Sequence, residues 1–166
     1  MEINMTRHQG AAGLKVAECI DKRFGTWRVR TDFQPSADEE TGQQTGVTFI
    51  ETEFPYKPSL QEVKTFVLGV INQHITDRIV GGMTWQGKPV WLSIENQLNF
   101  SQAVAPCTLK IGETADGVSL NEDFYTAEDL KSFWNACLAW KDKCLADGRA
   151  EKDTFDFTPY EEALNV

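Results

Sequence analysis

The sequence of 166 residues contains only two histidines, His8 and His74, and its four cysteines form no CxxC pair. Zinc and redox sites usually need clusters of these residues, so we predict no metal and no cofactor. The chain also lacks the GxSxG, HExxH and GxGxxG motifs. No nucleophile, general base or phosphate-binding loop can be assembled from what is present. We therefore predict that the protein is not an enzyme, and interpret His74 as a helix-edge residue.

Long apolar runs are also missing. No stretch approaches the roughly 18 apolar residues that a membrane span needs, and no apolar run follows a basic N-terminal segment. We therefore expect no membrane insertion, synthesis in the cytoplasm and reduced cysteines. Cationic residues are outnumbered as well, giving a net charge of −9. Residues 121–166 hold five basic and eleven acidic groups, which predicts no nucleic-acid binding there.

The remaining composition, 41% hydrophobic and 25% charged, is typical of a globular protein. We predict a single domain over residues 1–166. Residues 1–58 would form an N-terminal extension and a β-hairpin, and 59–166 a helix-hairpin-helix core with C-terminal helices. Strands and helices in mixed order predict an α+β fold, in which helices pack on one face of a small antiparallel sheet.

Period-two alternation predicts two paired strands over 27–33 and 47–54, joined by an exposed loop over 34–46. Residues 14–19 fit either a short strand or a helix. Two further strands are expected over 108–111 and 117–120. Because Arg28 and Arg30 alternate with larger residues, we interpret them as the solvent face of the first strand.

Helix signals recur along the rest of the chain. The capping box Ser59–Glu62 precedes a helix over 60–78, and a second helix over 94–104 should stop before Pro106. Thr126 caps a third helix that Gly148 should end or interrupt. A second capping box, Thr158–Glu161, precedes a short terminal helix. In the third helix, Cys137 and Cys144 lie on an apolar stripe and are expected to pack as buried free thiols.

The stretch between the first two helices is the most informative part of the sequence. Gly81 and Gly82 predict a helix C-terminus, and a tight turn at Gln86-Gly87 should join strands at 84–85 and 90–92. Ser93 is placed to cap the helix that follows. We expect a helix, a hairpin and a second helix.

Five tryptophans raise the alternative of glycan binding, because an exposed indole can stack on a sugar ring. Trp134 and Trp140 lie on or beside the apolar stripe and are expected in the core. Trp85 and Trp91, on the hairpin, are the candidate contact residues for a ligand or a partner. We favour a structural role for the hairpin and predict that Trp91 is buried.

The residue run 53–60, the hairpin and helix start at 81–100, and the segments 124–130 and 152–160 resemble a phage-associated domain family of unknown function. Its members occur in phages and prophages of gut bacteria, some near tail-fibre genes. The similarity covers roughly residues 27–166, and Met83 stands where the family usually has phenylalanine. The family has no established catalytic residues.

The resemblance implies a phage structural or assembly accessory protein that acts by protein–protein interaction. Its partners would be other phage proteins or host proteins, or further copies of itself, and it could be associated with the virion. The loop over 34–46 and the last helix are candidate contact surfaces. The alternative is a receptor-facing module that binds glycans through Trp85 and Trp91.

Overall fold

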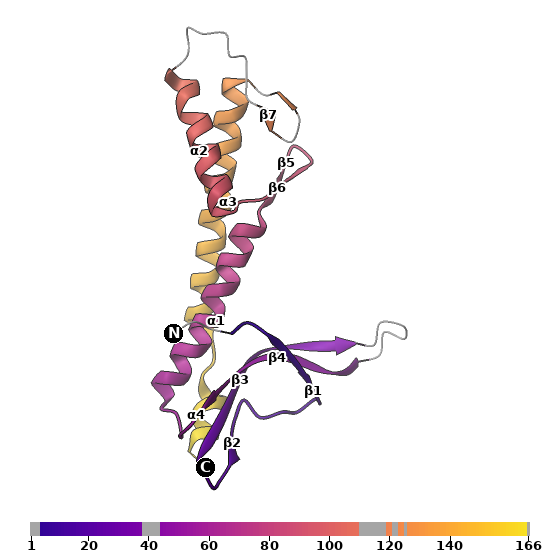
Figure 1. Ribbon diagram of the computed structural model, residues 1–166, viewed down its shortest axis with the longest axis vertical. Coiled ribbons are helices and arrows are strands. Elements are labelled where there is room, and N and C mark those ends of the chain that lie inside the picture. Colours follow the sequence, from indigo (N-terminus) through magenta and orange to yellow (C-terminus); the bar gives the residue numbers. More distant parts are fainter. Residues whose placement is uncertain (1–3, 38–43, 110–118, 121–122, 125, 166) are drawn as a thin grey trace. The chain divides into compact units, whose positions relative to one another are not determined.

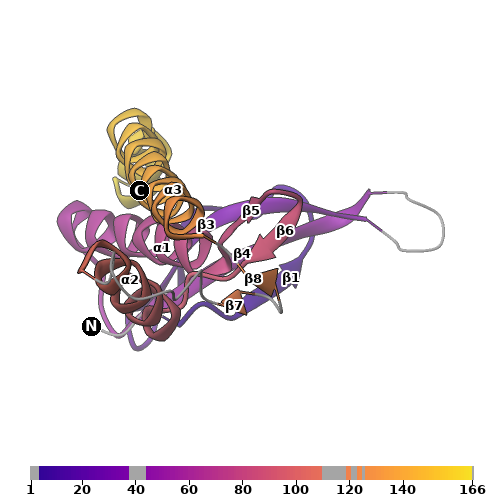
Figure 2. The same cartoon turned by 90° about the horizontal axis from the view of Figure 1, so that it is seen from above.

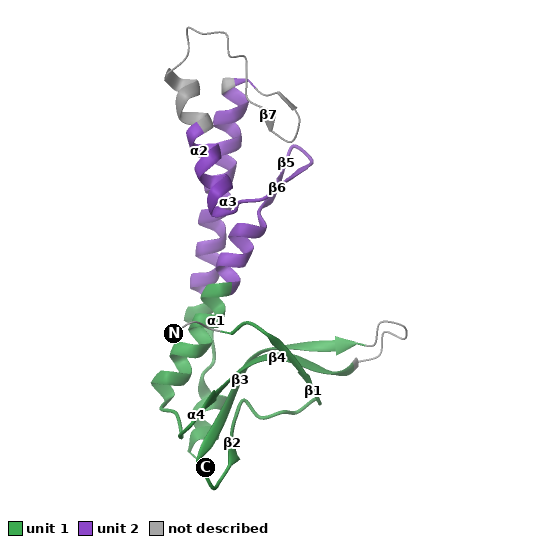
Figure 3. Cartoon of the chain, viewed as in Figure 1, with its two compact units in different colours: residues 1–73, 151–166 green, residues 74–150 purple. Residues whose placement is uncertain are grey.

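The computed structural model describes residues 4–37, 44–109, 119–120, 123–124 and 126–165 (Figure 1). It has the predicted α+β fold with a four-stranded antiparallel sheet. Two compact units divide the chain: unit 1 holds residues 1–73 and 151–166, and unit 2 holds residues 74–150 (Figure 3). The sequence predicted an internal division at residue 58, whereas the first unit continues to residue 73. That the whole chain acts as a single domain stays a prediction.

The strands and helices follow one another in a mixed order. They are β1 (Arg7–Gly10), β2 (Ala17–Asp21), β3 (Thr26–Ala37), β4 (Gln44–Phe54), α1 (Leu60–Gly81), β5 (Met83–Trp85), β6 (Lys88–Val90), α2 (Ile94–Leu109), β7 (Ser119–Leu120), β8 (Asp123–Phe124), α3 (Ala127–Thr154) and α4 (Thr158–Leu164).

The sheet of unit 1 has the strand order β1-β4-β3-β2. Strands β3 and β4 form the predicted hairpin, with Trp27 opposite Phe54, and run side by side in both views (Figures 1 and 2). Both strands are longer than predicted. They extend into the expected loop at 34–37 and 44–46, so those parts of the loop prediction were wrong, and residues 38–43 lie outside the described part.

The N-terminal part adds two strands, of which only β2 was among the alternatives. β1 pairs with β4, and His8 lies opposite Phe49. β2 pairs with β3, and Cys19 lies opposite Trp27. Because both strands are short and carry mixed side chains, their local pattern is weak, and pairing with the long hairpin stabilises them.

One face of this sheet carries charged groups, and here the prediction for Arg30 was wrong. Arg30 is 4% exposed, and its guanidinium contacts Glu18 at 2.7 Å and Glu51 at 3.1 Å. It also donates to the carbonyl of Lys15 at 3.0 Å. The connection between β1 and β2 therefore covers this arginine, and three oxygen acceptors compensate the burial of its charge. Arg28 stays partly exposed and pairs with Glu53.

The opposite face belongs to the apolar core of unit 1. Tyr160 of α4 is 3% exposed, and its hydroxyl donates to the carbonyl of Arg30 at 2.9 Å. Burial raises the pKa of Tyr160. The buried apolar residues of this unit in the core-facing side of the sheet, the first part of α1 and α4 are Ala17, Trp27, Val29, Ile50, Phe54, Val63, Phe66, Val67, Val70, Ile71, Tyr160 and Leu164. Phe49 is also buried, but it lies on the charged face, where the Arg30 guanidinium is 5.4 Å from its ring centroid.

The two predicted capping boxes have different outcomes. Ser59 donates from its backbone N–H to Glu62 at 2.8 Å and accepts from the Glu62 N–H at 3.3 Å, which confirms the first. The backbone N–H of Ser59 is the main cause of a lowered Glu62 pKa. The second box was wrong, because the N–H of Thr158 donates to Asp156 at 2.9 Å. Phe157 becomes the N-cap, and Thr158 is already helical.

Two helices of unit 2 continue past residues that were expected to stop them. α2 passes Pro106 and ends three residues later at Leu109. A proline in the last turn removes only one main-chain donor, so a short continuation is tolerated. The structure also places residues 108–109 in this helix, which contradicts the first half of the strand predicted over 108–111, and residues 110–111 lie outside the described part. The other expected strand, 117–120, is confirmed for residues 119–120, which pair as β7 with β8.

Gly148 does not end α3, which continues to Thr154. A Cβ atom at position 148 would lie 2.1 Å from Cδ1 of Ile75 and 2.3 Å from its Cγ1. The glycine therefore serves close packing between α1 and α3 inside unit 2, and the prediction mistook a packing glycine for a helix stop. The backbone at Gly148 does not have a positive φ, so main-chain conformation does not require glycine there. The close approach of Ile75 on α1 does.

Candidate functional site

The hairpin of unit 2 is built on the C-terminus of α1, as the sequence predicted. Gly82 has φ of +82°, and a Cβ there would lie 1.8 Å from the carbonyl oxygen of Val90. Only glycine combines this conformation with so close a main-chain approach. Gln86 and Gly87 both have positive φ, which is typical of a type I′ hairpin turn. The N–H of Leu92 then donates to the carbonyl of Val80 at 3.1 Å and fixes the hairpin exit.

Trp85 lies in the apolar core of unit 2. It is 8% exposed, and its ring meets the ring of Phe133 edge-to-face at a centroid distance of 5.3 Å. Phe100 approaches the same ring of Phe133 from α2 at 5.0 Å. Val90, Leu92, Leu130 and Cys137 complete this cluster, and Trp134 and Trp140 pack against it as partly buried neighbours. Trp85 is therefore a packing residue, and the expected contact role does not fit its position.

Trp91 has the opposite environment, and the prediction that it is buried was wrong. Its side chain is 60% exposed, whereas the next residue, Leu92, is 2% exposed. Strand β6 ends at Val90, so the expected strand over 90–92 is shorter than predicted. The alternation of buried and exposed side chains nevertheless continues beyond the strand, so that Leu92 points inward and Trp91 points outward. The two candidate tryptophans consequently do not form a paired open groove.

Four local hydrogen bonds hold the main chain beside Trp91. The side-chain amide of Asn96 donates to the carbonyl of Trp91 at 3.1 Å, and that of Gln97 donates to the carbonyl of Leu92 at 2.7 Å. The N–H of Asn96 donates to the Ser93 hydroxyl at 3.1 Å, which confirms the predicted helix cap. The N–H of Gln97 donates to the Ser93 carbonyl at 2.8 Å. An exposed indole is thus carried on a backbone that is fixed on both sides.

Two further large apolar side chains follow in the first turns of α2. Ile94 is 82% exposed and Leu98 is 56% exposed. Their spacing of four residues places them on one helix face. We call Trp91, Ile94 and Leu98 the Trp91 surface. The sequence analysis did not identify Ile94 and Leu98 as contact residues. Their positions on either side of the polar run 95–97 could have indicated an exposed apolar pair.

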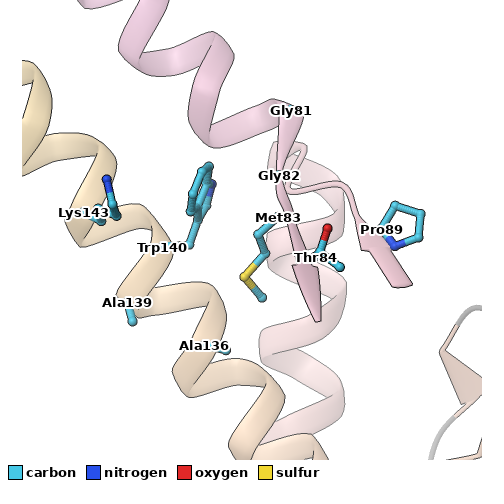
Figure 4. Close-up of a pocket in the computed structure, with 9 residues that line it drawn as sticks. All are labelled: Gly81, Gly82, Met83, Thr84, Pro89, Ala136, Ala139, Trp140 and Lys143. Atoms are coloured by element: carbon cyan, nitrogen blue, oxygen red, sulfur yellow. The ribbon is translucent and has the colours of Figure 1, made fainter. Parts of the chain in front are cut away.

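A shallow hollow of about 750 Å³ lies on unit 2 between the start of the hairpin and α3 (Figure 4). Figure 4 shows Met83, Thr84 and Pro89 on the hairpin side and Trp140 and Lys143 on α3. The indole Nε1 of Trp140 is buried and has no hydrogen-bond partner among the described residues. Lys143 is paired with Asp147 on its own helix. The hollow is thus lined mainly by apolar groups, and the Lys143 ammonium group at its edge forms an ion pair with Asp147.

Cys137 of α3 offers no reactive thiolate at this site. Cys137 and Cys144 are free and buried, as predicted. Burial raises the pKa of the Cys137 thiol to about 11, so this side chain is protonated at neutral pH. Within the described ranges, no three His, Cys, Asp or Glu residues lie close enough together to hold a metal ion. His74 is half-buried on α1.

No protein-family model, curated protein or solved structure matches this chain. Among the helices that the structure describes, none is both long and apolar enough to cross a membrane.

Proposed function

We propose that this protein is a protein-interaction module that binds its partner through the Trp91 surface. The observation that supports the proposal is the exposure of three large apolar side chains, Trp91, Ile94 and Leu98, within eight residues. Single exposed apolar residues are common, but a group of them at one place marks interaction sites. Tryptophan is also among the residues that contribute most to binding energy when a partner buries them.

The rigid backbone under this surface supports the same function. Asn96, Gln97 and Ser93 fix the main chain from residue 91 to residue 97. A partner that binds here orders few additional main-chain torsions, so less of the contact energy is lost to conformational entropy. The polar residues of this run therefore position the apolar ones, and their own contribution to binding is indirect.

We further propose that the partner is a phage component, and that the protein has a structural or accessory role in assembly. This part rests on the resemblance of the hairpin and the helix start, residues 81–100, to the phage-associated family. The acidic C-terminal segment would steer a basic partner surface toward the protein, because its six excess negative charges act over a Debye length of roughly 8 Å. Self-association through the same surface is the competing form of this proposal.

Glycan binding is the second candidate, and the exposed ring of Trp91 is the observation that favours it. A sugar needs an aromatic face together with polar groups that fix its orientation. The neighbouring amides of Asn96 and Gln97 already donate to the main chain at 3.1 and 2.7 Å. The large apolar neighbours of Trp91 suit a protein partner better than a carbohydrate.

The test is co-sedimentation of the purified chain with phage particles and assembly intermediates from cells that produce them. The wild type should sediment with one of these species, and Trp91→Ala and Leu98→Gln should each weaken that binding at least tenfold. Leu145→Gln is a matched control, because Leu145 is 39% exposed on α3 and outside the Trp91 surface. Full binding by the Leu98→Gln variant, or an equal loss in the control, would contradict the proposal. Binding to a glycan array that depends on Trp91 would favour the alternative.

A further inference from the structure

The Trp91 surface lies on a helix face that cannot turn inward. On the inner side of the same segment, Leu92 is 2% exposed and belongs to the core cluster of unit 2, and Phe100 packs against that cluster. These contacts fix the rotation of α2 about its own axis. Ile94 and Leu98 therefore stay on the outer side, because turning them inward would expose Phe100 instead.

The exposure of the three apolar side chains indicates the shape of a surface that can cover them. Ile94 is 82% exposed, Trp91 60% and Leu98 56%, so each side chain projects into the solvent. A flat partner surface would touch only the tips of such side chains and leave most of their area in water. A concave surface surrounds them, and an amphipathic helix that lies in an apolar groove is a recurring form of protein recognition.

The charge of this segment is concentrated in one side chain. Glu95 is the only charged residue between Lys88 and Lys110. It is exposed, and because it precedes Leu98 by three residues, the two side chains are neighbours on the helix surface. Glu95 forms no ion pair with any residue in the described ranges. A single uncompensated carboxylate therefore lies beside the apolar side chains.

We infer that the partner's binding site is an apolar groove with one lysine or arginine side chain at its border, opposite Glu95. The inference rests on the proposed function and names the chemistry of the partner. A groove that buries Leu98 also removes water from the neighbouring carboxylate, and a cation in the groove compensates that loss. The cation then distinguishes the partner from other apolar grooves.

A second copy of this chain, bound through the same face, does not meet these requirements. It would present a projecting apolar ridge where a groove is needed. It would also bring a second Glu95 carboxylate to the interface, and like charges at an interface are unfavourable.

The test measures how tightly the full chain binds the phage species with which the wild type co-sediments, at several salt concentrations. Glu95→Lys should weaken binding by roughly 30-fold, because it places two cations opposite each other, and Glu95→Gln by roughly fivefold. The affinity of Glu95→Gln should also depend less on salt than that of the wild type, because the variant lacks the ion pair.

Glu128→Lys is the matched control. Glu128 is exposed and is the second residue of α3, as Glu95 is the second residue of α2. Both substitutions place a cation at a helix N-terminus and lose the same favourable interaction with the helix dipole. Glu128→Lys should bind within twofold of the wild type, and thermal midpoints should show that both variants are folded.

A charge exchange tests the inferred cation directly. In the protein that a photoreactive side chain at position 98 captures, the basic residue nearest the cross-link is replaced by glutamate. This change should weaken binding of the wild type and improve binding of Glu95→Lys at least tenfold.

The outcomes separate this inference from the proposed function. If Trp91→Ala and Leu98→Gln weaken binding while Glu95→Lys binds like the wild type, the proposed function stands and the inference is overturned. An equal loss in Glu128→Lys, or a charge exchange without rescue, also overturns the inference. Self-association that Trp91→Ala abolishes would assign the face to a second copy instead. If the wild type sediments with no phage species, the proposed function itself fails.

Discussion

Replacing Gly82 with alanine should be one of the most destabilising single-methyl changes in the hairpin. Position 82 has φ of +82°, and the added Cβ would lie 1.8 Å from the carbonyl oxygen of Val90 and 2.9 Å from Cα of Trp91. Both are main-chain atoms, so no side-chain rotation can relieve the overlap. The hairpin exit has to move away from the end of α1.

The expected magnitude has two parts. A residue other than glycine in the left-handed region costs roughly 1–2 kcal/mol. Displacing the exit also weakens the hydrogen bond from Leu92 to Val80 and the packing of Leu92, which is 2% exposed. A lost hydrogen bond and a shifted core side chain together cost about 2–3 kcal/mol. We therefore expect Gly82→Ala to lower the free energy of unfolding by about 3–5 kcal/mol.

Two neighbouring glycines provide matched controls for the same chemical change. Gly87 also has positive φ, +81°, but nothing lies within 4 Å of its added Cβ. Gly87→Ala should cost only the conformational part, roughly 1–2 kcal/mol. Gly81 ends α1 without positive φ and with open space around its Cβ. Gly81→Ala should be neutral or stabilise the protein by up to about 1 kcal/mol.

The assay is urea unfolding followed by tryptophan fluorescence, with free energies taken from the midpoint and slope of each transition. The predicted order of stability is Gly81→Ala, wild type, Gly87→Ala and Gly82→Ala, from highest to lowest. If Gly82→Ala and Gly87→Ala lose the same amount, the close approach to Val90 contributes nothing, and the reasoning is refuted.

Trp85→Ala should cost about 3–5 kcal/mol and Trp91→Ala less than about 1 kcal/mol in the same assay; equal losses would contradict their assigned environments. Gly148→Ala should cost about 1–3 kcal/mol, and much of the loss should disappear in an Ile75→Ala background, as a double-mutant cycle would measure. The Cys137 thiol keeps its proton in the folded state up to a pKa of about 11, against 9.0 ordinarily. Below pH 9 the thiol is protonated in both the folded and the unfolded chain, and its full contribution to the free energy of unfolding is present. As the pH rises from 9 to about 11, only the unfolded chain ionises, and the free energy of unfolding falls by up to about 3 kcal/mol. Cys137→Ala should remove this decrease in the free energy of unfolding between pH 9 and 11. The same decrease in the variant and the wild type would contradict the assignment to Cys137.

The features predicted well from the sequence depend on local chemistry. The break at Gly82, the turn at Gln86-Gly87 and the caps at Ser59 and Ser93 each need only residues close in sequence. Main-chain conformation and capping are determined within one or two turns, so short patterns are sufficient. The paired strands β3 and β4 were found for the same reason, because both are long and alternate clearly.

The features that were missed depend on partners distant in sequence. Arg30 alternates like a surface residue, but Glu18, Glu51 and the connection before β2 enclose it. Gly148 resembles a helix stop until the position of Ile75 is known. No local pattern states which segment covers an arginine or which helix approaches a glycine.

The candidate site shows the same limit. The sequence pointed to the correct segment and to both tryptophans, but only the structure separates buried Trp85 from exposed Trp91. Both residues are large and aromatic and both flank the same turn. Their difference arises because Phe133 of α3 occupies the inner side, at 5.3 Å from the Trp85 ring. Ile94 and Leu98 were missed because a single apolar side chain is a weak signal until its exposure is known.

The most direct test of the central claim is site-specific photo-cross-linking from the Trp91 surface. A photoreactive side chain is placed at position 91 in one chain, at position 98 in a second and at position 145 in a third. Each chain is made in cells that produce phage, and the cross-linked proteins are identified by mass spectrometry. Our account predicts that positions 91 and 98 capture the same phage protein and that position 145 does not. Capture of unrelated proteins from positions 91 and 98, or the same products from all three positions, would contradict it.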